Sequence, residues 1–257
     1  MTAGAARRPR NPWLLRRPDE ESPALLFCLP YPGTGASLYH RWPRRIGPVE
    51  VCPVQLPARE NRLREPPCAT YEQAAAELVA ALLPHFDRPF AFFGHCGSVF
   101  IGFEAALLLD RRGLPLPEHL FVSSMMPPQE AAKAPILRIP ADELGRVVEE
   151  LMRARNVEPT PEFVELSLGP LHADVEAHRR YSKPDPVLLP CPLTTLGWSD
   201  DDQIAPAELA GWSRHGRTRH VVLTGTHWSF LDAPEELQEE IAGVFADAKA
   251  APIAASR

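Results

Sequence analysis

The 257-residue sequence lacks the features of several large classes of protein. No apolar run approaches the roughly 20 residues that span a bilayer, so no association with a membrane is expected. A formal net charge of -6 and the absence of a basic stripe argue against nucleic-acid binding. The stretch Pro32-Gly33-Thr34-Gly35 is not followed by the Lys-Ser/Thr of a phosphate-binding loop. We therefore expect no nucleotide or flavin cofactor.

Cysteine is also scarce, with five residues, an odd number, and no C-x-x-C pair. This pattern predicts neither a disulfide framework nor a zinc site, and we expect no metal. Cys28 and Cys52 lie in apolar runs typical of buried strands. Cys96 alone lies at a turn that would expose it.

The first 22 residues are basic, with five arginines by residue 17. They lack the apolar core of a signal peptide, so a cytoplasmic protein is expected. We interpret residues 1–22 as an arm that is either solvated or docked on the surface. The remaining residues, 23–257, are long enough for one α/β domain with a sizeable core.

Short apolar runs alternate with helical patterns through this domain. Six runs are expected to be strands, being short and bounded by proline or glycine: Ala24–Leu29, Val49–Val54, Phe90–Phe93, Leu120–Ser123, Leu193–Leu196 and His220–Leu223. Their near-continuous apolarity indicates burial on both faces, as in parallel sheets. Helices are expected between them, at Tyr71–Leu83, Ser98–Arg112, Pro206–His215 and Pro234–Lys249. The alternation predicts an α/β fold with a mostly parallel, doubly wound sheet.

Residues 126–183 interrupt this alternation. They contain the helical patterns Ala141–Arg155 and Pro161–Tyr181 but no convincing strand. We interpret the segment as an inserted helical lid over the carboxyl edge of the sheet. Ordinary peripheral helices are the alternative.

The stretch FFGHCGS, residues 92–98, lies between a predicted strand and a predicted helix. This is the context of a nucleophile elbow, in which a strained turn of small residues presents a nucleophile. Cys96 occupies the usual serine position, and Ser98 replaces the last glycine of G-x-S-x-G. Carboxylates follow a later strand at 200–202, and His227 follows the final strand. Because parallel strands end at one edge of a sheet, these groups are expected to meet there.

Nearly the whole chain resembles type II thioesterases, the stand-alone α/β-hydrolases that serve polyketide and nonribosomal peptide assembly lines. The resemblance is carried by NPWLLRRP, LPYPGTGASLYHRW, QLPARENRLREPP, GHCGSVFIGFE, LHADVEAHRRYS, LGWSDDDQIAPAELAGW and TGTHWSFL. It implies an α/β-hydrolase fold with Cys96 as nucleophile, Asp201 as acid and His227 as base. Asp201 is preferred to its neighbours because Ile204 and Trp212 then match the family's apolar residue and tryptophan. It also implies acyl or peptidyl carrier proteins as partners, which deliver a small acyl group on a phosphopantetheine arm.

Two departures from the family pattern bear on the chemistry. Cys96 replaces serine, and a helix N-terminus with a nearby histidine is expected to lower the pKa of its thiol. Pro32 occupies the position whose N–H normally forms half of the oxyanion hole, and proline has no N–H. The Gly97 amide is expected to donate still, with Tyr31, Gly33 or a side chain compensating. A locally shifted loop is the alternative.

Trp198 and Trp228 flank the acid and base positions. They are expected either to wall the substrate pocket or to pack in the core.

These observations predict a covalent Cys96 acyl-enzyme that acts on carrier-protein thioesters. Transfer of the acyl or aminoacyl group to a thiol or amine is favoured, because a thioester intermediate stays activated toward both. Hydrolytic editing or release is one alternative, and it is what the family resemblance itself implies. A non-catalytic carrier-binding protein, with a structural cysteine in a dead site, is the other.

Overall fold

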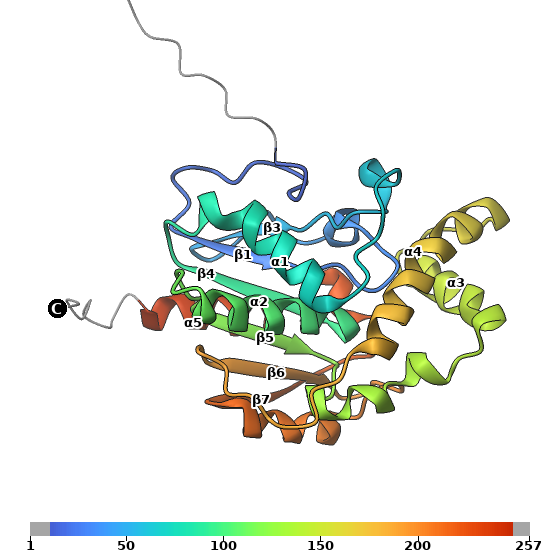
Figure 1. Ribbon diagram of the computed structural model, residues 1–257. Coiled ribbons are helices and arrows are strands. Elements are labelled where there is room, and N and C mark those ends of the chain that lie inside the picture. The colour runs from blue at the N-terminus through green and yellow to red at the C-terminus, as the bar shows by residue number, and fades with distance from the viewer. Residues whose placement is uncertain (1–10, 249–257) are drawn as a thin grey trace, which may run out of the picture.

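The computed structural model of the chain describes residues 11–248. One sheet runs through it in the strand order β2-β3-β1-β4-β5-β6-β7 (Figure 1). The strands are β1 Ala24–Cys28, β2 Arg45–Ile46, β3 Val49–Pro53, β4 Phe90–His95, β5 His119–Ser123, β6 Leu193–Trp198 and β7 Thr218–Leu223. All neighbouring strands are parallel except β2, which pairs antiparallel with β3. The six predicted strands are confirmed, whereas β2 is too short to show a pattern in the sequence.

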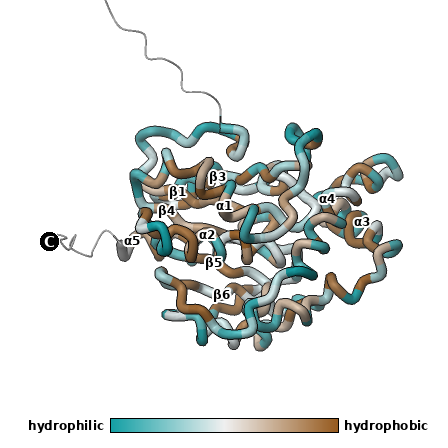
Figure 2. The backbone as a smooth tube through the Cα atoms, in the orientation of Figure 1, coloured by the Kyte–Doolittle hydropathy of each residue, from teal (hydrophilic) through white to brown (hydrophobic). Residues whose placement is uncertain are grey.

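The central strands β1 and β4 lie in the middle of the hydrophobic core. β1 pairs with β4 in the register Leu25↔Phe90 to Cys28↔Phe93, and every residue of both strands is buried. Their hydrophobic colouring runs through the middle of the molecule in Figure 2. β7 differs from the expectation of burial on both faces, because it is the edge strand and Val222 is 61% exposed.

Helices cover both faces of the sheet, as expected for a doubly wound fold (Figure 1). The α-helices are α1 Tyr71–Leu82, α2 Val99–Arg111, α3 Leu144–Ala154, α4 Pro161–Arg180 and α5 Glu235–Ala248. Thr70 caps α1 by accepting a hydrogen bond from the Gln73 amide, which fixes where that helix begins. Pro206–His215 is helical as predicted, but as a 3-10 helix. Within residues 11–248, no helix combines the length and apolarity needed to cross a bilayer.

The segment 126–183 is helical, as its sequence indicates. It contains α3, α4 and three shorter 3-10 helices, at Pro128–Lys133, Pro135–Arg138 and Ala141–Glu143. Figure 1 shows α3 and α4 beyond the tips of the central strands. The carboxyl edge of the sheet, where ligands bind in open α/β folds, therefore faces this segment.

Residues 11–22, the described part of the predicted arm, pack against the body of the domain. Trp13 and Leu14 are buried, and Leu14 forms an isolated antiparallel bridge with Val54. The Arg16 guanidinium donates to the Val51 carbonyl at 3.1 Å. Residues 1–10 lie outside the described residues.

Candidate active site

The turn between β4 and α2 holds Cys96 in a strained backbone conformation. Its φ is 58°, in the left-handed region that few side-chain-bearing residues adopt. At Gly94, an added Cβ would lie 2.7 Å from the Val99 Cα, so only glycine lets the strand and helix pass this closely. Ser98 fits at the last position because its hydroxyl donates to the His95 carbonyl at 3.0 Å. The backbone therefore has the geometry of a nucleophile elbow.

Asp201 and His227 come together at the same edge of the sheet, after β6 and β7. The Nδ1 atom of His227 lies 3.0 and 3.1 Å from the two carboxylate oxygens of Asp201. Both side chains are almost fully buried, at 1% exposed for His227 and 0% for Asp201. Asp200 and Asp202 are exposed, so burial distinguishes the middle carboxylate from its neighbours.

Further donors hold the Asp201 carboxylate in its charged form. The Ser124 hydroxyl donates to Oδ2 at 2.7 Å, and the Gln203 and Ile204 amides donate to Oδ1 at 2.9 and 3.0 Å. Burial acts to raise the pKa of Asp201, but the hydrogen bonds from His227, Ser124 and Ile204 outweigh it and hold the pKa well below its ordinary value. The carboxylate is thus an acceptor that fixes the His227 proton on Nδ1.

Two expectations from the sequence about Cys96, its exposure and its lowered thiol pKa, are wrong. The turn does not expose it, since it is only 7% exposed, and Cys68 is instead the half-buried cysteine among the five. The pKa of its thiol is raised to about 12 rather than lowered. Burial is the main cause and the Asp201 charge adds to it, while hydrogen bonds from the Gly97 amide and the Tyr31 hydroxyl act against it.

Cys96 and His227, the predicted nucleophile and base, are not hydrogen-bonded to each other. The hydrogen bonds that His227 makes among residues 11–248 go to Asp201 and, at 3.3 Å between the two Nε2 atoms, to His95. None of them reaches Cys96. The three residues of the predicted triad thus lie at one edge of the sheet, with a hydrogen bond between His227 and Asp201 but none between His227 and Cys96 among residues 11–248.

The predicted oxyanion loop follows β1 and lies beside the elbow. Pro32 is within 3.5 Å of a Cβ built on Gly97, so the residue without an N–H adjoins the expected donor. The Gly33 amide already donates to Asp174 Oδ2 of α4 at 2.7 Å. Tyr31 is buried, and its ring lies 6.1 Å from the His227 ring and 5.1 Å from the Trp228 ring.

The two tryptophans have different places. Trp198 is fully buried and donates its indole N–H to the Ser123 hydroxyl at 3.2 Å, so it packs beneath the site. Trp228 is half-buried, with its ring 4.9 Å from that of His227 and against Tyr31. Of the two, only Trp228 stands where it can wall a substrate pocket.

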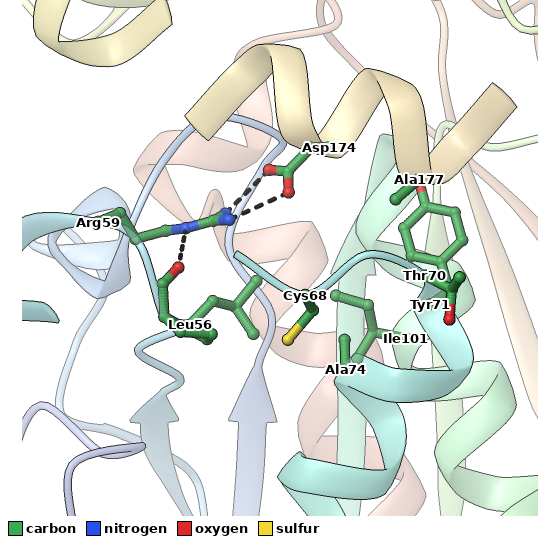
Figure 3. A pocket seen from close by; sticks show the side chains of 10 residues that line it. Leu56, Arg59, Cys68, Thr70, Tyr71, Ala74, Ile101, Asp174 and Ala177 are labelled. Atoms are coloured by element: carbon green, nitrogen blue, oxygen red, sulfur yellow. Dashed lines mark hydrogen bonds and ion pairs between the residues drawn. The ribbon is translucent and has the colours of Figure 1, made fainter. Parts of the chain in front are cut away.

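Helix α4 covers the elbow and is tied down by an ion pair that the sequence did not reveal. Asp174 accepts two hydrogen bonds from the buried Arg59 guanidinium, at 2.9 and 3.0 Å (Figure 3). One turn further along α4, His178 contacts the Tyr71 hydroxyl at 3.0 Å, and its Nδ1 lies 3.1 Å from a Cβ built on Gly97. Arg59 and Asp174 occur in two of the stretches that carry the family resemblance, but no local pattern pairs residues 115 positions apart.

A small cavity of about 20 Å³ lies beside this pair. Figure 3 shows its lining, which includes Cys68, Tyr71 and Ile101. Its volume suits a single water molecule, so little space is left here between α4 and helices α1 and α2.

The chain is similar to known thioesterase proteins over most of its length. A family model described as "Thioesterase domain" matches residues 24–245. The chain is 33% identical over 241 residues to the linear gramicidin dehydrogenase LgrE of Brevibacillus parabrevis, covering 87% of this chain and 88% of that protein. It is 30% identical over 244 residues to the gramicidin S biosynthesis protein GrsT of Aneurinibacillus migulanus, covering 89% and 92%.

Solved structures give the same result for the fold. RedJ, a thioesterase from the prodiginine biosynthetic pathway of Streptomyces coelicolor, has a TM-score of 0.77 at 30% identity, over 95% of this chain and 96% of that one. BorB, described as the type II thioesterase from the borrelidin biosynthetic cluster, has a TM-score of 0.74 at 28% identity, over 90% and 97%. The predicted α/β-hydrolase fold is thereby confirmed.

Proposed function

The chain belongs to the thioesterase domain family, and from that premise we propose that it acts as a type II thioesterase-like enzyme on the acyl thioesters of assembly-line carrier proteins. The observation that carries the proposal is Cys96 at a strained elbow beside the buried Asp201–His227 pair. Relatives named for gramicidin S biosynthesis and prodiginine biosynthesis support a carrier protein as the partner. The substrate then arrives as an acyl group on a phosphopantetheine arm, and the chemistry needs no cofactor of the enzyme's own.

The first half-reaction moves the acyl group onto Cys96. The His227 Nε2 atom takes the thiol proton, and the thiolate attacks the thioester carbonyl carbon. A carbon–sulfur bond forms, and the carbonyl π electrons move onto oxygen. When the oxyanion collapses, the bond to the phosphopantetheine sulfur breaks, and that thiolate takes the proton back from His227. Asp201 holds the imidazolium in place throughout.

The second half-reaction releases the acyl group to an acceptor. A thiol or amine gives a proton to His227 as it attacks the Cys96 thioester, and the Cys96 thiolate leaves and is reprotonated. Exchange of one thioester for another is nearly balanced in energy, and thiols and amines attack thioesters better than water does. A cysteine nucleophile therefore favours transfer.

The oxyanion in both steps needs hydrogen-bond donors close to Cys96. The Gly97 amide and the Tyr31 hydroxyl both act to lower the pKa of the Cys96 thiol, so both are polar groups near the sulfur that can donate to an oxygen that develops beside it. The Gly33 amide is engaged by Asp174 while α4 is closed, and Pro32 has no N–H. We assign the missing half of the oxyanion hole to the Tyr31 hydroxyl.

Hydrolysis is the second candidate function, and membership of a thioesterase family favours it. Intact-mass analysis after addition of an acyl-carrier protein separates the two. Transfer predicts an acyl adduct on the enzyme that persists until a thiol or amine is added, and Cys96→Ala abolishes it. Brisk loss of the acyl group to water without an acceptor establishes hydrolysis instead. An adduct that survives Cys96→Ala overturns the assignment of the nucleophile.

A further inference from the structure

His95, the residue before the nucleophile, is buried in the site with both ring nitrogens engaged. Its Nδ1 atom lies 2.8 Å from the Ser123 hydroxyl, and its Nε2 atom lies 3.3 Å from the His227 Nε2 atom. The ring stacks on Phe230 with centroids 3.8 Å apart and planes 14° from parallel. Strand β4, the stacked ring and two polar contacts therefore hold this imidazole in one orientation.

The direction of each hydrogen bond in this chain follows from its Asp201 end. The Asp201 carboxylate can only accept, so a neutral His227 carries its proton on Nδ1 and has a lone pair on Nε2. The hydrogen bond between the two Nε2 atoms then requires the proton of a neutral His95 on Nε2, pointing at His227. His95 Nδ1 therefore accepts the Ser123 hydroxyl proton, while the Ser123 oxygen accepts the Trp198 indole N–H.

The His95 N–H donates to the lone pair on the His227 Nε2 atom. The same lone pair must take the proton of the Cys96 thiol. We propose that His95 is a positioning residue that holds the basic nitrogen of His227 in the resting enzyme, so that Cys96 becomes nucleophilic only when His227 exchanges His95 for the thiol. The inference rests on the proposed role of Cys96 as nucleophile. The exchange replaces one hydrogen bond by another, so its net free-energy cost is small.

The pKa directions agree with this arrangement. Burial, followed by the neighbouring His227, holds the pKa of His95 well below its ordinary value, so the ring stays neutral and keeps the Nδ1 lone pair that Ser123 needs. Titratable groups also face Cys96 and its neighbours from the surrounding elements: Tyr31, Tyr71, Glu150, His178 and Asp201. All of these stay unchanged when only His95 is replaced.

Nitrogen-15 NMR of the full chain with labelled histidine tests the assignment without any variant. His95 is expected as the Nε2–H tautomer and His227 as the Nδ1–H tautomer at pH 7. Finding the proton of His227 on Nε2, or the proton of His95 on Nδ1, overturns the proposal.

The pH profile of Cys96 alkylation by iodoacetamide, followed by peptide mapping, tests the consequence. The half-buried Cys68 is first replaced by serine so that it does not react. His95→Phe keeps the stacking on Phe230 but removes the N–H, which frees His227 to accept from the thiol. The alkylation rate at pH 7.5 is expected to rise about tenfold, with the profile moved by about one unit to lower pH.

Two matched variants complete the test. His95→Gln keeps a donor near the Nε2 position and is expected to stay within about twofold of the parent. His119→Phe removes another buried histidine, at the opposite end of the sheet, and is expected to change nothing. A His95→Phe profile that is unshifted or moves to higher pH overturns the proposal. Because alkylation needs no acyl donor, this result is independent of whether an acyl adduct forms on Cys96, which tests the proposed function separately.

Discussion

The His227–Asp201 pair and Cys96 differ in their hydrogen bonding and in their protonation. On the base side, His227 and Asp201 have all their polar atoms bonded, to each other and to His95, Ser124 and backbone amides. On the nucleophile side, Cys96 is buried with a raised pKa. Beside it, the Gly33 amide donates to Asp174 of α4.

This difference indicates that activation requires a new contact between Cys96 and His227. The base needs no rearrangement to hold its proton on Nδ1, since Asp201 already fixes it. The thiol needs a partner that it lacks at rest, and its loop is covered by a helix. A covered, protonated thiol is protected from stray electrophiles, because the thiolate is the reactive form. Substrate binding is then expected to act on α4 and on the His227–Cys96 distance.

Asp201→Asn is expected to have the largest effect and tests whether the base side is as fixed as its contacts indicate. An amide no longer holds the Nδ1–H tautomer, so the rate of Cys96 acylation should fall by about 1,000- to 10,000-fold. Asp200→Asn and Asp202→Asn are the matched controls, because both carboxylates are exposed. Stopped reactions analysed by intact mass give the rates. Equal losses in all three variants contradict the assignment of the acid.

Tyr31→Phe probes the donor on the nucleophile side. Removal of one oxyanion donor costs roughly 3 kcal/mol, so the rate constant for acyl transfer should fall by about 100-fold with little change in substrate binding. Tyr39→Phe is the control, since that buried hydroxyl donates to the Leu29 carbonyl and has no part in the pKa of Cys96. If the two variants lose activity equally, the Tyr31 hydroxyl is not an oxyanion donor.

Pro32→Ala combined with Cys96→Ser reverses both departures from the family pattern. Alanine restores an N–H beside Gly97, and serine forms an oxyester. Hydrolysis of acyl-carrier thioesters is expected to rise about tenfold over the parent, which is part of the stabilisation that one donor provides. Chromatographic assay of free acid without any acceptor measures it. A parent that already hydrolyses faster than the double variant contradicts the transfer mechanism.

Asp174→Asn is expected to weaken the packing of helix α4 over Cys96. The neutral amide weakens the charge-assisted bonds to Arg59 and Gly33, so α4 should open more often. Alkylation of Cys96 is expected to become about three- to fivefold faster by mass spectrometry, with the same pH dependence. Glu176→Gln, on the exposed face of α4, is the control. An unchanged rate in Asp174→Asn shows that this pair does not limit access to the site.

The smallest expected effect is on stability. The pKa of Asp201 is depressed in the folded state, so its stabilisation is fully present above its ordinary value of 3.8 and is lost as the pH falls through the folded value. The melting temperature of Asp201→Asn should be lower than the parent's at pH 7 by ~2–4 °C for each kcal/mol lost. Calorimetry should show the gap closing below about pH 4. A gap that widens in acid contradicts the depressed pKa.

The sequence by itself determined the sheet, the elbow and the order of the site residues. Strand and helix patterns are local, so Phe90–Phe93 with the small residues after it was enough to place Cys96 at the end of β4. The carboxyl ends of parallel strands share one edge, so Asp201 and His227 had to arrive near it. Choosing Asp201 among three carboxylates came from the resemblance to type II thioesterases, through Ile204 and Trp212, and its burial agrees.

Only the tertiary structure decided the hydrogen-bond partners, the burial and the pKa directions of those residues. The contacts that close the site join residues far apart in the chain, 141 positions for Gly33 and Asp174 and 132 for His95 and His227. The pKa of Cys96 went opposite to the expectation because helix α4 and the core remove it from water, a burial that no local pattern encodes. Periodicity states which side chains face inward, whereas hydrogen-bond partners and desolvation depend on which elements finally pack together.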